Sequence, residues 1–392
     1  MILVNIVCFS AIDWDFLFQR AQHIAKGLSE NGCSIIYVNP PNNLPRDVSV
    51  KKPATQYITD FAQYIRVGIF QRKALVNRHL ITFNPVNYFG PNRTLQQIFL
   101  SLEMLMLRSL NLLYFRSNRI DIWLFFEPTY SSYVLPYVAK GKIVYDCADE
   151  SSGFSNVSPH IVETEQNLIR KSALVIVTST RLLQKVRKIN RNCLYVPNAA
   201  DFQHFHSATK IMNEPREIED LKKPVIGFIG AIYDWIDTEL ICELAKIHPD
   251  FSVLLVGPVN FDKNRLEKYS NITMVGTREY GILPQYLSSM DVCLIPFKIN
   301  KLTLASNPIK LYEYLAAGKP IVSTDLPEVA KNASDVILIG KNHRDFIQKV
   351  EAALNTTSEE EEAARLRRIE FAKANSWNER VGSIKRYLEN SR

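Results

Sequence analysis

Three polar residues in the stretch SNPIKLYEYLAAGKPIV, residues 306–322, share one side of a predicted helix. Asn307, Lys310 and Glu313 fall at positions i, i+3 and i+6. A helix N-terminus presents free N–H groups and roughly half a positive charge, so a lysine beside it favours phosphate. A carboxylate one turn deeper accepts hydrogen bonds from vicinal hydroxyls. This spacing predicts a site for a ribose diphosphate; the alternative is a solvated face with an ion pair.

Acidic residues follow two strand-like runs in the first half of the chain. Glu127 lies in FFEPTY, and Asp149 and Glu150 lie in YDCADESSGF. An attacking hydroxyl must lose its proton, and a carboxylate with a pKa near the working pH accepts it. We predict that Asp149 is this base, with Glu127 as the second candidate. For Asp149, the alternative is a helix or turn cap.

Two further positions are candidates for contact with a phosphate. Gly230 ends a strand-like run in GFIGAIYDW, and a glycine there lets a phosphate approach the following turn. Arg20 lies on the first predicted helix, one turn before His23. Arg20 is predicted to meet a phosphate, while His23 is more typical of a packed core or surface position. The alternative for Gly230 is an ordinary strand-to-helix turn.

The helix that carries Lys310 and Glu313 has clear end signals. Asn307 is a favoured N-cap, Pro308 suits the first helical position, and Gly318 suits the left-handed conformation just past the end. The sequence predicts a helix from Pro308 to Ala317. Pro320 prevents its continuation, and PIVST reads as a buried strand.

Strand and helix patterns alternate along both halves of the chain. Strand-like runs include ILVNIVCF, SIIYVN, IDIWLFF, KIVYD and ALVIVTS, and after the polar stretch 206–223 the pattern restarts with PVIGFIG, FSVLLVG, VCLIPF and PIVST. This alternation is typical of α/β domains with doubly wound parallel sheets. We predict one such domain over 1–205, a second over 206–375 and a C-terminal helix over 376–392 that crosses back to the first domain.

Composition supports a globular protein of two domains. The chain has 392 residues, of which 46% are hydrophobic. Met1 runs directly into an apolar strand-like stretch, so we expect no targeting segment. The six cysteines have neither CxxC nor zinc spacing, so they are expected to be reduced. The DWD triplet at 13–15 follows the wrong strand for a metal-bound nucleotide, and no metal site is predicted.

Positive charge is concentrated in the first half of the chain. Residues 46–119 hold 11 Lys and Arg and 3 acidic residues, a net charge of +8. They include the apolar stretch 95–115, which Glu103 and Arg108 interrupt too strongly for a membrane span. The segment suits an anionic membrane surface; the alternative is a helix packed on the first domain. No nucleic-acid recognition motif accompanies the charge, so nucleic acid is not an expected partner.

The motifs and their order resemble the GT-B glycosyltransferases that build bacterial surface polysaccharides. LPQYLSSMDVCLIPF and SNPIKLYEYLAAGKPIVSTDLPEV resemble the second half of that family, and the first 154 residues contain stretches similar to teichuronic acid or exopolysaccharide transferases. The resemblance implies two Rossmann-like domains facing a central cleft, and transfer of a sugar from a nucleotide-sugar donor to a saccharide or lipid-linked acceptor. It implies that the reaction needs no cofactor and no essential metal. It also implies a cytoplasmic protein that is peripheral at the inner face of the membrane.

The resemblance also assigns roles to individual residues. Glu313 matches the family glutamate that holds the ribose, whereas Ala305 stands where a first glutamate is expected, which puts retention of stereochemistry in doubt. Lys310 resembles a lysine that meets the diphosphate in a related inverting glucuronosyltransferase. Arg278 and Tyr280, in VGTREYG, correspond to the loop around the nucleobase; the alternative is loop surface.

Two other function classes remain open from the sequence. One is a GT-B epimerase or hydrolase of sugar nucleotides, and the other is a non-catalytic subunit that binds a nucleotide sugar. The sequence does not specify the sugar, the nucleobase, the acceptor or the oligomeric state.

Overall fold

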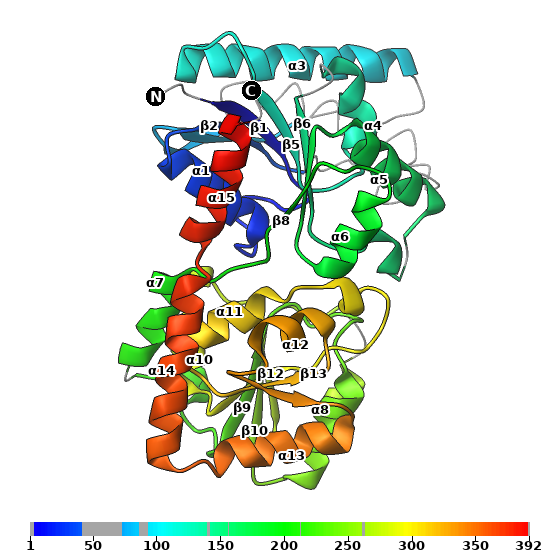
Figure 1. Cartoon of the computed structure of the whole chain (residues 1–392). Helices are drawn as coiled ribbons and strands as arrows, with labels where there is room; N and C mark the ends of the chain where they lie inside the picture. Colours follow the sequence, from blue (N-terminus) through cyan, green and yellow to red (C-terminus); the bar gives the residue numbers. More distant parts are fainter. Residues whose placement is uncertain are drawn as a thin grey trace. The chain divides into compact units, whose positions relative to one another are not determined.

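The computed structural model describes residues 4–40, 73–85, 93–138, 142–155, 157–211, 213–260 and 263–390. The chain forms two compact units, Met1–Val196 and Pro197–Arg392 (Figure 1). The sequence-based boundary, after residue 205, lies further along the chain. The structure assigns the segment from Pro197 to the second unit because Asn198 binds Asn307 and Phe205 packs in that unit's core.

The first unit contains an eight-stranded sheet in the order β3-β4-β2-β1-β5-β6-β7-β8. All neighbouring strands are parallel except β3 and β4. The strands are β1 (Asn5–Phe9), β2 (Ser34–Val38), β3 (Lys73–Asn77), β4 (Leu80–Phe83), β5 (Ile122–Phe125), β6 (Ile143–Cys147), β7 (Leu174–Val177) and β8 (Cys193–Tyr195). The helices include α1 (Arg20–Glu30), α3 (Arg93–Phe115), α4 (Ser131–Val134), α5 (Pro159–Lys171) and α6 (Thr180–Arg187).

The second unit contains a six-stranded, wholly parallel sheet in the order β11-β10-β9-β12-β13-β14. Its strands are β9 (Val225–Ile229), β10 (Ser252–Val256), β11 (Ile272–Gly276), β12 (Val292–Ile295), β13 (Ile321–Thr324) and β14 (Leu338–Gly340). Its helices are α7 (Phe202–His206), α8 (Thr238–Ile247), α9 (Asn264–Glu267), α10 (Leu283–Ser289), α11 (Ile309–Ala316), α12 (Pro327–Ala333), α13 (His343–Leu354), α14 (Ser358–Ala374) and α15 (Trp377–Asn390) within the described residues.

The strand order reverses once in each sheet, between β1 and β5 and between β9 and β12. In doubly wound sheets, ligands bind outside the carboxyl ends of the strands at this reversal. The central strands β1, β9 and β10 are buried along their whole length and mostly apolar, because helices cover both faces of each sheet. The predicted pair of doubly wound α/β domains is confirmed.

Helix α11 is slightly shorter than predicted. It runs from Ile309 to Ala316, with Pro308 at the N-cap position and Gly318 in the left-handed conformation at φ +70°. The prediction that Asn307 is the N-cap is therefore wrong. Its side-chain oxygen instead accepts the backbone N–H of Asn198 at 2.8 Å. The side-chain oxygen that would otherwise cap the helix is therefore bonded to a residue that is distant in sequence.

Candidate functional site

The carboxyl ends of β9, β10 and β11 are lined by the glycines Gly230, Gly257 and Gly276, all at positive φ. A Cβ added to Gly257 would lie 1.9 Å from the carbonyl oxygen of Gly230. These glycines allow the backbones of neighbouring strand ends to approach each other closely, which a side chain would prevent. The sequence analysis did not identify Gly257, although VLLVG repeats the pattern of an apolar strand ending in glycine.

Lys310 lies beside Gly230. A Cβ placed on Gly230 would lie 3.2 Å from Cε of Lys310. The structure therefore unites two predicted residues 80 positions apart, at the end of the strand where the sheet order reverses. This is where a doubly wound domain binds a phosphate-bearing ligand.

Lys310 and Glu313 form an ion pair with 2.7 Å between Nζ and Oε2. The side chain of Glu313 is only 2% exposed and that of Lys310 is 19% exposed. The pair is thus not the solvated helix face of the alternative interpretation, because water reaches little of either group. A partly buried cation and carboxylate at the point where the strand order reverses can give up their mutual ion pair when a ligand binds. The cation then contacts the ligand's phosphate, and the carboxylate contacts its hydroxyls.

Asn307, three positions before Lys310, is held by its own hydrogen-bond partners. It is 3% exposed, and its amide nitrogen donates to the hydroxyl of Tyr312 at 3.2 Å. Its backbone carbonyl accepts a hydrogen bond from the side chain of Asn198 at 2.6 Å. These contacts hold Asn307 at the start of α11, and its predicted role in donor binding stays a prediction.

Tyr280 belongs to the same neighbourhood. Its ring stacks on His204 with centroids 4.3 Å apart, and its hydroxyl lies 3.4 Å from Oδ2 of Asp201. Burial, followed by the charges of Glu313 and Asp201, raises the pKa of the Tyr280 hydroxyl. Tyr280 is therefore a neutral aromatic wall near Glu313.

Arg278 has its own partners. Its Nε donates to Oε1 of Glu217 at 2.8 Å and lies 2.9 Å from the hydroxyl of Tyr286. The structure gives no contact between Arg278 and the Lys310–Glu313 pair. Its predicted role beside a nucleobase stays a prediction, and a ligand would have to compete with Glu217 for the guanidinium.

In the first unit, Asp149 follows β6 and is an exposed residue. Within the described residues, its carboxylate has no hydrogen bond or ion pair. The surrounding protein raises its pKa to about 6, chiefly by desolvation; Arg20 lowers the pKa, and Asp146 and Glu165 raise it. A carboxylate whose pKa is raised toward 6 is suited to accept a proton.

The turn around Asp149 is held by its neighbours. The Thr178 hydroxyl donates to the carbonyl of Ala148 at 2.6 Å, and the Ser151 hydroxyl donates to Glu165 at 2.8 Å. Lys185 bridges Glu165 at 3.0 Å and Glu150 at 2.8 Å. Glu150 and Glu165 therefore have structural partners, which leaves Asp149 as the accessible acid of this turn. Local sequence patterns do not indicate the residues that hold this turn, because their partners lie on other elements.

Arg20 is buried and paired. Its Nε lies 2.8 Å from Oδ2 of Asp146 and its Nη2 lies 2.9 Å from Oδ1. This pairing occupies one edge of the guanidinium, so a direct contact of Arg20 with a phosphate stays a prediction. His23, one turn further, is buried in a T-shaped contact with Phe18, so of the core and surface positions that its pattern left open it takes the core position.

Glu127 caps the turn that leads into α4. Its two carboxylate oxygens accept the backbone N–H groups of Thr129 and Tyr130, each at 2.7 Å. Burial raises its pKa, while these hydrogen bonds lower it. Glu127 lies after β5, at the reversal of the first sheet, but its oxygens are already engaged. The geometry favours Asp149 over Glu127 as the base.

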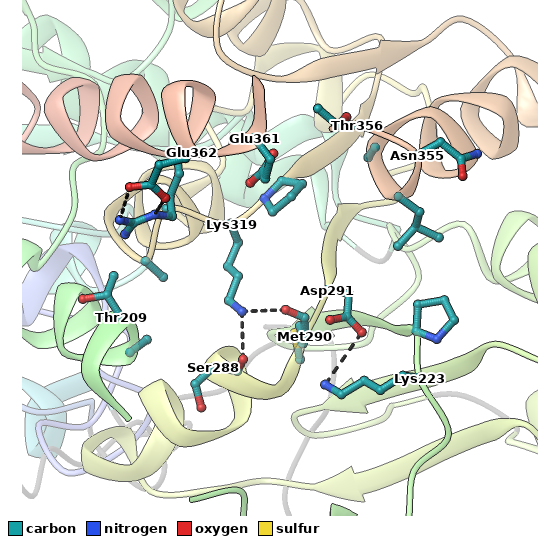
Figure 2. Close-up of a pocket in the computed structure, with 18 of the residues that line it drawn as sticks. Thr209, Lys223, Ser288, Met290, Asp291, Lys319, Asn355, Thr356, Glu361 and Glu362 are labelled. Carbon is teal, nitrogen blue, oxygen red and sulfur yellow. Dashed lines mark hydrogen bonds and ion pairs between the residues drawn. The ribbon is translucent and has the colours of Figure 1, made fainter. Parts of the chain in front are cut away.

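A cavity of about 1340 Å³ opens at the amino-terminal edge of the second sheet, away from these glycines (Figure 2). Lys319 points into it, but its ammonium donates to the carbonyls of Ser288 and Met290 at 2.8 and 2.6 Å. Lys223 lies 3.7 Å from Asp291 on the same wall. These cations satisfy carbonyls and a carboxylate at the end of α10 and the start of β12, so they have structural partners.

Within the described ranges, no three or more His, Cys, Asp or Glu side chains are grouped so that they could hold a metal ion.

Comparison with known proteins finds a family match within the second unit. Residues 223–356 match the family model described as glycosyl transferases group 1. A protein named as the teichuronic acid biosynthesis glycosyltransferase TuaH of Bacillus subtilis is 29% identical over 268 residues. The match covers 63% of this chain and 66% of TuaH, just under two thirds of that protein's length.

Solved structures resemble the whole chain. Sucrose-phosphate synthase from Thermosynechococcus elongatus matches with a TM-score of 0.68 at 14% identity, and HepE of Anabaena in complex with UDP and glucose matches with 0.67 at 11% identity. Each match covers 99% of this chain and 100% of the other. At these identities the likeness shows the fold. Residues 223–356 thus resemble the group 1 glycosyl transferases, and the whole chain has the two-domain GT-B fold.

Proposed function

We propose that the protein transfers a sugar from a nucleotide-sugar donor to a saccharide acceptor, carried on a lipid, in the synthesis of a surface polysaccharide. The observation that carries this proposal is the Lys310–Glu313 pair beside Gly230 at the reversal of the second sheet. A cation, a helix start and a glycine at a strand end suit a diphosphate, and a buried carboxylate suits a ribose. The family match over residues 223–356 supports the same chemistry.

On the donor side, Lys310 offsets the negative charge that grows on the diphosphate as it leaves. Glu313 accepts hydrogen bonds from the ribose hydroxyls, and Tyr280 bounds the same pocket. The charge on the leaving group is thus balanced by protein groups, and we propose that the reaction needs no metal ion and no cofactor. HepE was solved with UDP and glucose, so hexosyl-UDP compounds are the first donors to test.

On the acceptor side, Asp149 takes the proton of the attacking hydroxyl. The acceptor oxygen forms a bond to the anomeric carbon, and the bond from that carbon to the diphosphate breaks with its electron pair on the phosphate oxygen. Asp149 suits this step because the residue is exposed, its carboxylate has no partner among the described residues and its pKa is raised to about 6.

The proposed location is the cytoplasm, with peripheral attachment to the inner face of the membrane. The charge of residues 46–119 supports this location, because a net +8 attracts an anionic surface. Residues 46–72 and 86–92 of this segment lie outside the described residues, so the argument from charge rests on the sequence.

A thermal-shift screen of UDP-, GDP- and ADP-sugars tests the proposal. A bound donor raises the melting temperature by mass action, and the nucleobase that does so identifies the donor class. Incubation with a saccharide acceptor then measures transfer. Donor turnover without acceptor would instead support an epimerase or hydrolase, and binding without turnover would support a non-catalytic subunit. The absence of a shift with any nucleotide sugar would contradict the proposal.

A further inference from the structure

Helix α3 exposes a row of large apolar side chains along its length. The exposed fractions are 41% for Leu95, 49% for Ile98, 43% for Leu102, 60% for Leu105, 52% for Leu112 and 70% for Leu113. Exposed apolar residues are common singly, but a continuous row marks a surface that meets another apolar phase. In Figure 1 this helix, drawn in cyan, lies along the outside of the first unit.

The opposite face of α3 is also apolar. Leu100, Met104, Leu107 and Leu110 are buried, and the helix packs on β1 and β2 of the sheet. This face accounts for the helix's place in the fold. The exposed row is therefore additional to what folding requires, since a surface helix normally turns a polar face outward.

The charges on α3 favour an anionic partner. Arg93, Arg108 and Arg116 are exposed on the helix or directly after it, whereas Glu103, which alone is acidic among residues 93–118, is buried. The exposed surface of this segment thus combines leucines with arginines and presents no carboxylate. Long basic side chains beside an apolar row are typical of helices that lie at the surface of an anionic bilayer.

Helix α3 is also, within the described residues, the helix long and apolar enough to cross a membrane, with a mean hydropathy of 1.4 in its most apolar window. Crossing would strip it from the sheet and take Glu103 and Asn111, both buried, into hydrocarbon. Packing on the sheet favours an orientation parallel to the bilayer.

We propose that α3 is the membrane-binding element of this protein, and that its row from Leu95 to Leu113 inserts into the headgroup region of an anionic bilayer while its other face stays on the sheet. This deepens the proposed membrane location and rests on it, because a lipid-linked acceptor requires the enzyme to work at a bilayer. Donor binding in the second unit does not depend on it.

The experiment is flotation with phosphatidylcholine vesicles that contain or lack phosphatidylglycerol, at low and high salt. The test variant is Leu105→Glu/Leu113→Glu. The matched control is Leu366→Glu, which changes a leucine that is 53% exposed on α14 of the second unit. The wild type and the control are expected to float with anionic vesicles at low salt, and the test variant to lose at least tenfold in binding. The variant Arg108→Glu/Arg116→Glu is expected to lose the salt-dependent part of the binding to anionic vesicles.

Three results would overturn the proposal: no flotation of the wild type, equal flotation with neutral vesicles, or unchanged flotation of the test variant. A dimer of the wild type that the test variant abolishes would also overturn it, because a second copy would then cover the row. The melting temperature of the test variant checks its fold. Its thermal shift with nucleotide sugars separates a failure of this proposal from a failure of the proposed donor site.

Discussion

The candidate sites of the two units differ in whether their charged side chains are paired. In the second unit, Lys310 and Glu313 satisfy each other at 2.7 Å. In the first unit, Asp149 is an exposed residue whose carboxylate has no partner among the described residues, while the acids around it are paired with Arg20 and Lys185. The contrast separates two tasks. In a binding site, two opposite charges can form an ion pair until a ligand replaces each partner. A proton acceptor, in contrast, must have carboxylate oxygens without hydrogen-bond partners.

The largest expected effect comes from removing the free carboxylate. Asp149→Asn keeps the shape and removes the basicity, so turnover should fall by about 100-fold or more with donor affinity nearly unchanged. Steady-state kinetics and donor titration measure the two quantities. Glu127→Gln is the comparison, because its carboxylate serves a turn. Near-normal turnover in Asp149→Asn would indicate that Glu127 or Glu150, rather than Asp149, is the base.

The pH profile sharpens the same point. Because the base must be ionised, kcat/KM should rise with pH through an apparent pKa of about 6 and then level off. Below that value the rate should fall about tenfold per pH unit. A profile that stays flat from about pH 5 to 8 would disagree with a base of this pKa.

The turn that carries Asp149 offers a smaller effect. Thr178→Val removes the 2.6 Å hydrogen bond to the carbonyl of Ala148, so the turn loosens and kcat should fall about tenfold with the donor KM unchanged. The matched control is Ser172→Ala, which removes a buried hydroxyl bonded to the Leu168 carbonyl at 2.8 Å, away from the turn. Both variants should lose similar stability. An equal loss of kcat in the control would show that general destabilisation, rather than positioning, is responsible.

The smallest expected effect concerns stability. The pKa of Asp149 is raised above its ordinary value of 3.8, so the folded state binds its proton more tightly than the unfolded state. Stability conferred by this group is therefore present at low pH and is lost as pH rises from about 4 to about 6. Asp149→Asn should melt slightly higher than the wild type at neutral pH, with the difference vanishing near pH 4. Exposure of the residue keeps the difference small, and calorimetry at the two pH values measures it.

Local spacing predicted much of the second site. The i, i+3 relation of Lys310 and Glu313 follows from helix geometry, and proline and glycine signals fixed α11 to within one residue at each end. The alternation of strands and helices predicted two doubly wound units. What local pattern could not supply was the partner of Asn307, because the competing N–H belongs to Asn198, 109 positions away.

Long-range pairing accounts for the other differences. The partner of Arg20 is Asp146, 126 residues away, and that of Arg278 is Glu217, 61 residues away. No sequence pattern links such residues, since only the folded sheet or loop brings them together. The roles predicted for Arg20 and Arg278 were drawn from position and resemblance, which cannot reveal that a carboxylate already engages the guanidinium.

The donor site is tested most directly by calorimetric titration of Lys310→Ala and Glu313→Ala with a nucleoside and with its diphosphate, using the nucleobase found in the thermal-shift screen. Lys310→Ala should weaken diphosphate binding by about 1.5 to 3 kcal/mol and change nucleoside binding much less, because only the diphosphate offers it a charged hydrogen-bond partner. Glu313→Ala should weaken both ligands, since both contain the ribose. Lys373→Ala, at an exposed position of α14, is the control and should change neither affinity. Unchanged affinities in all four titrations of the two site variants would contradict the assignment of Lys310 and Glu313 to the donor site.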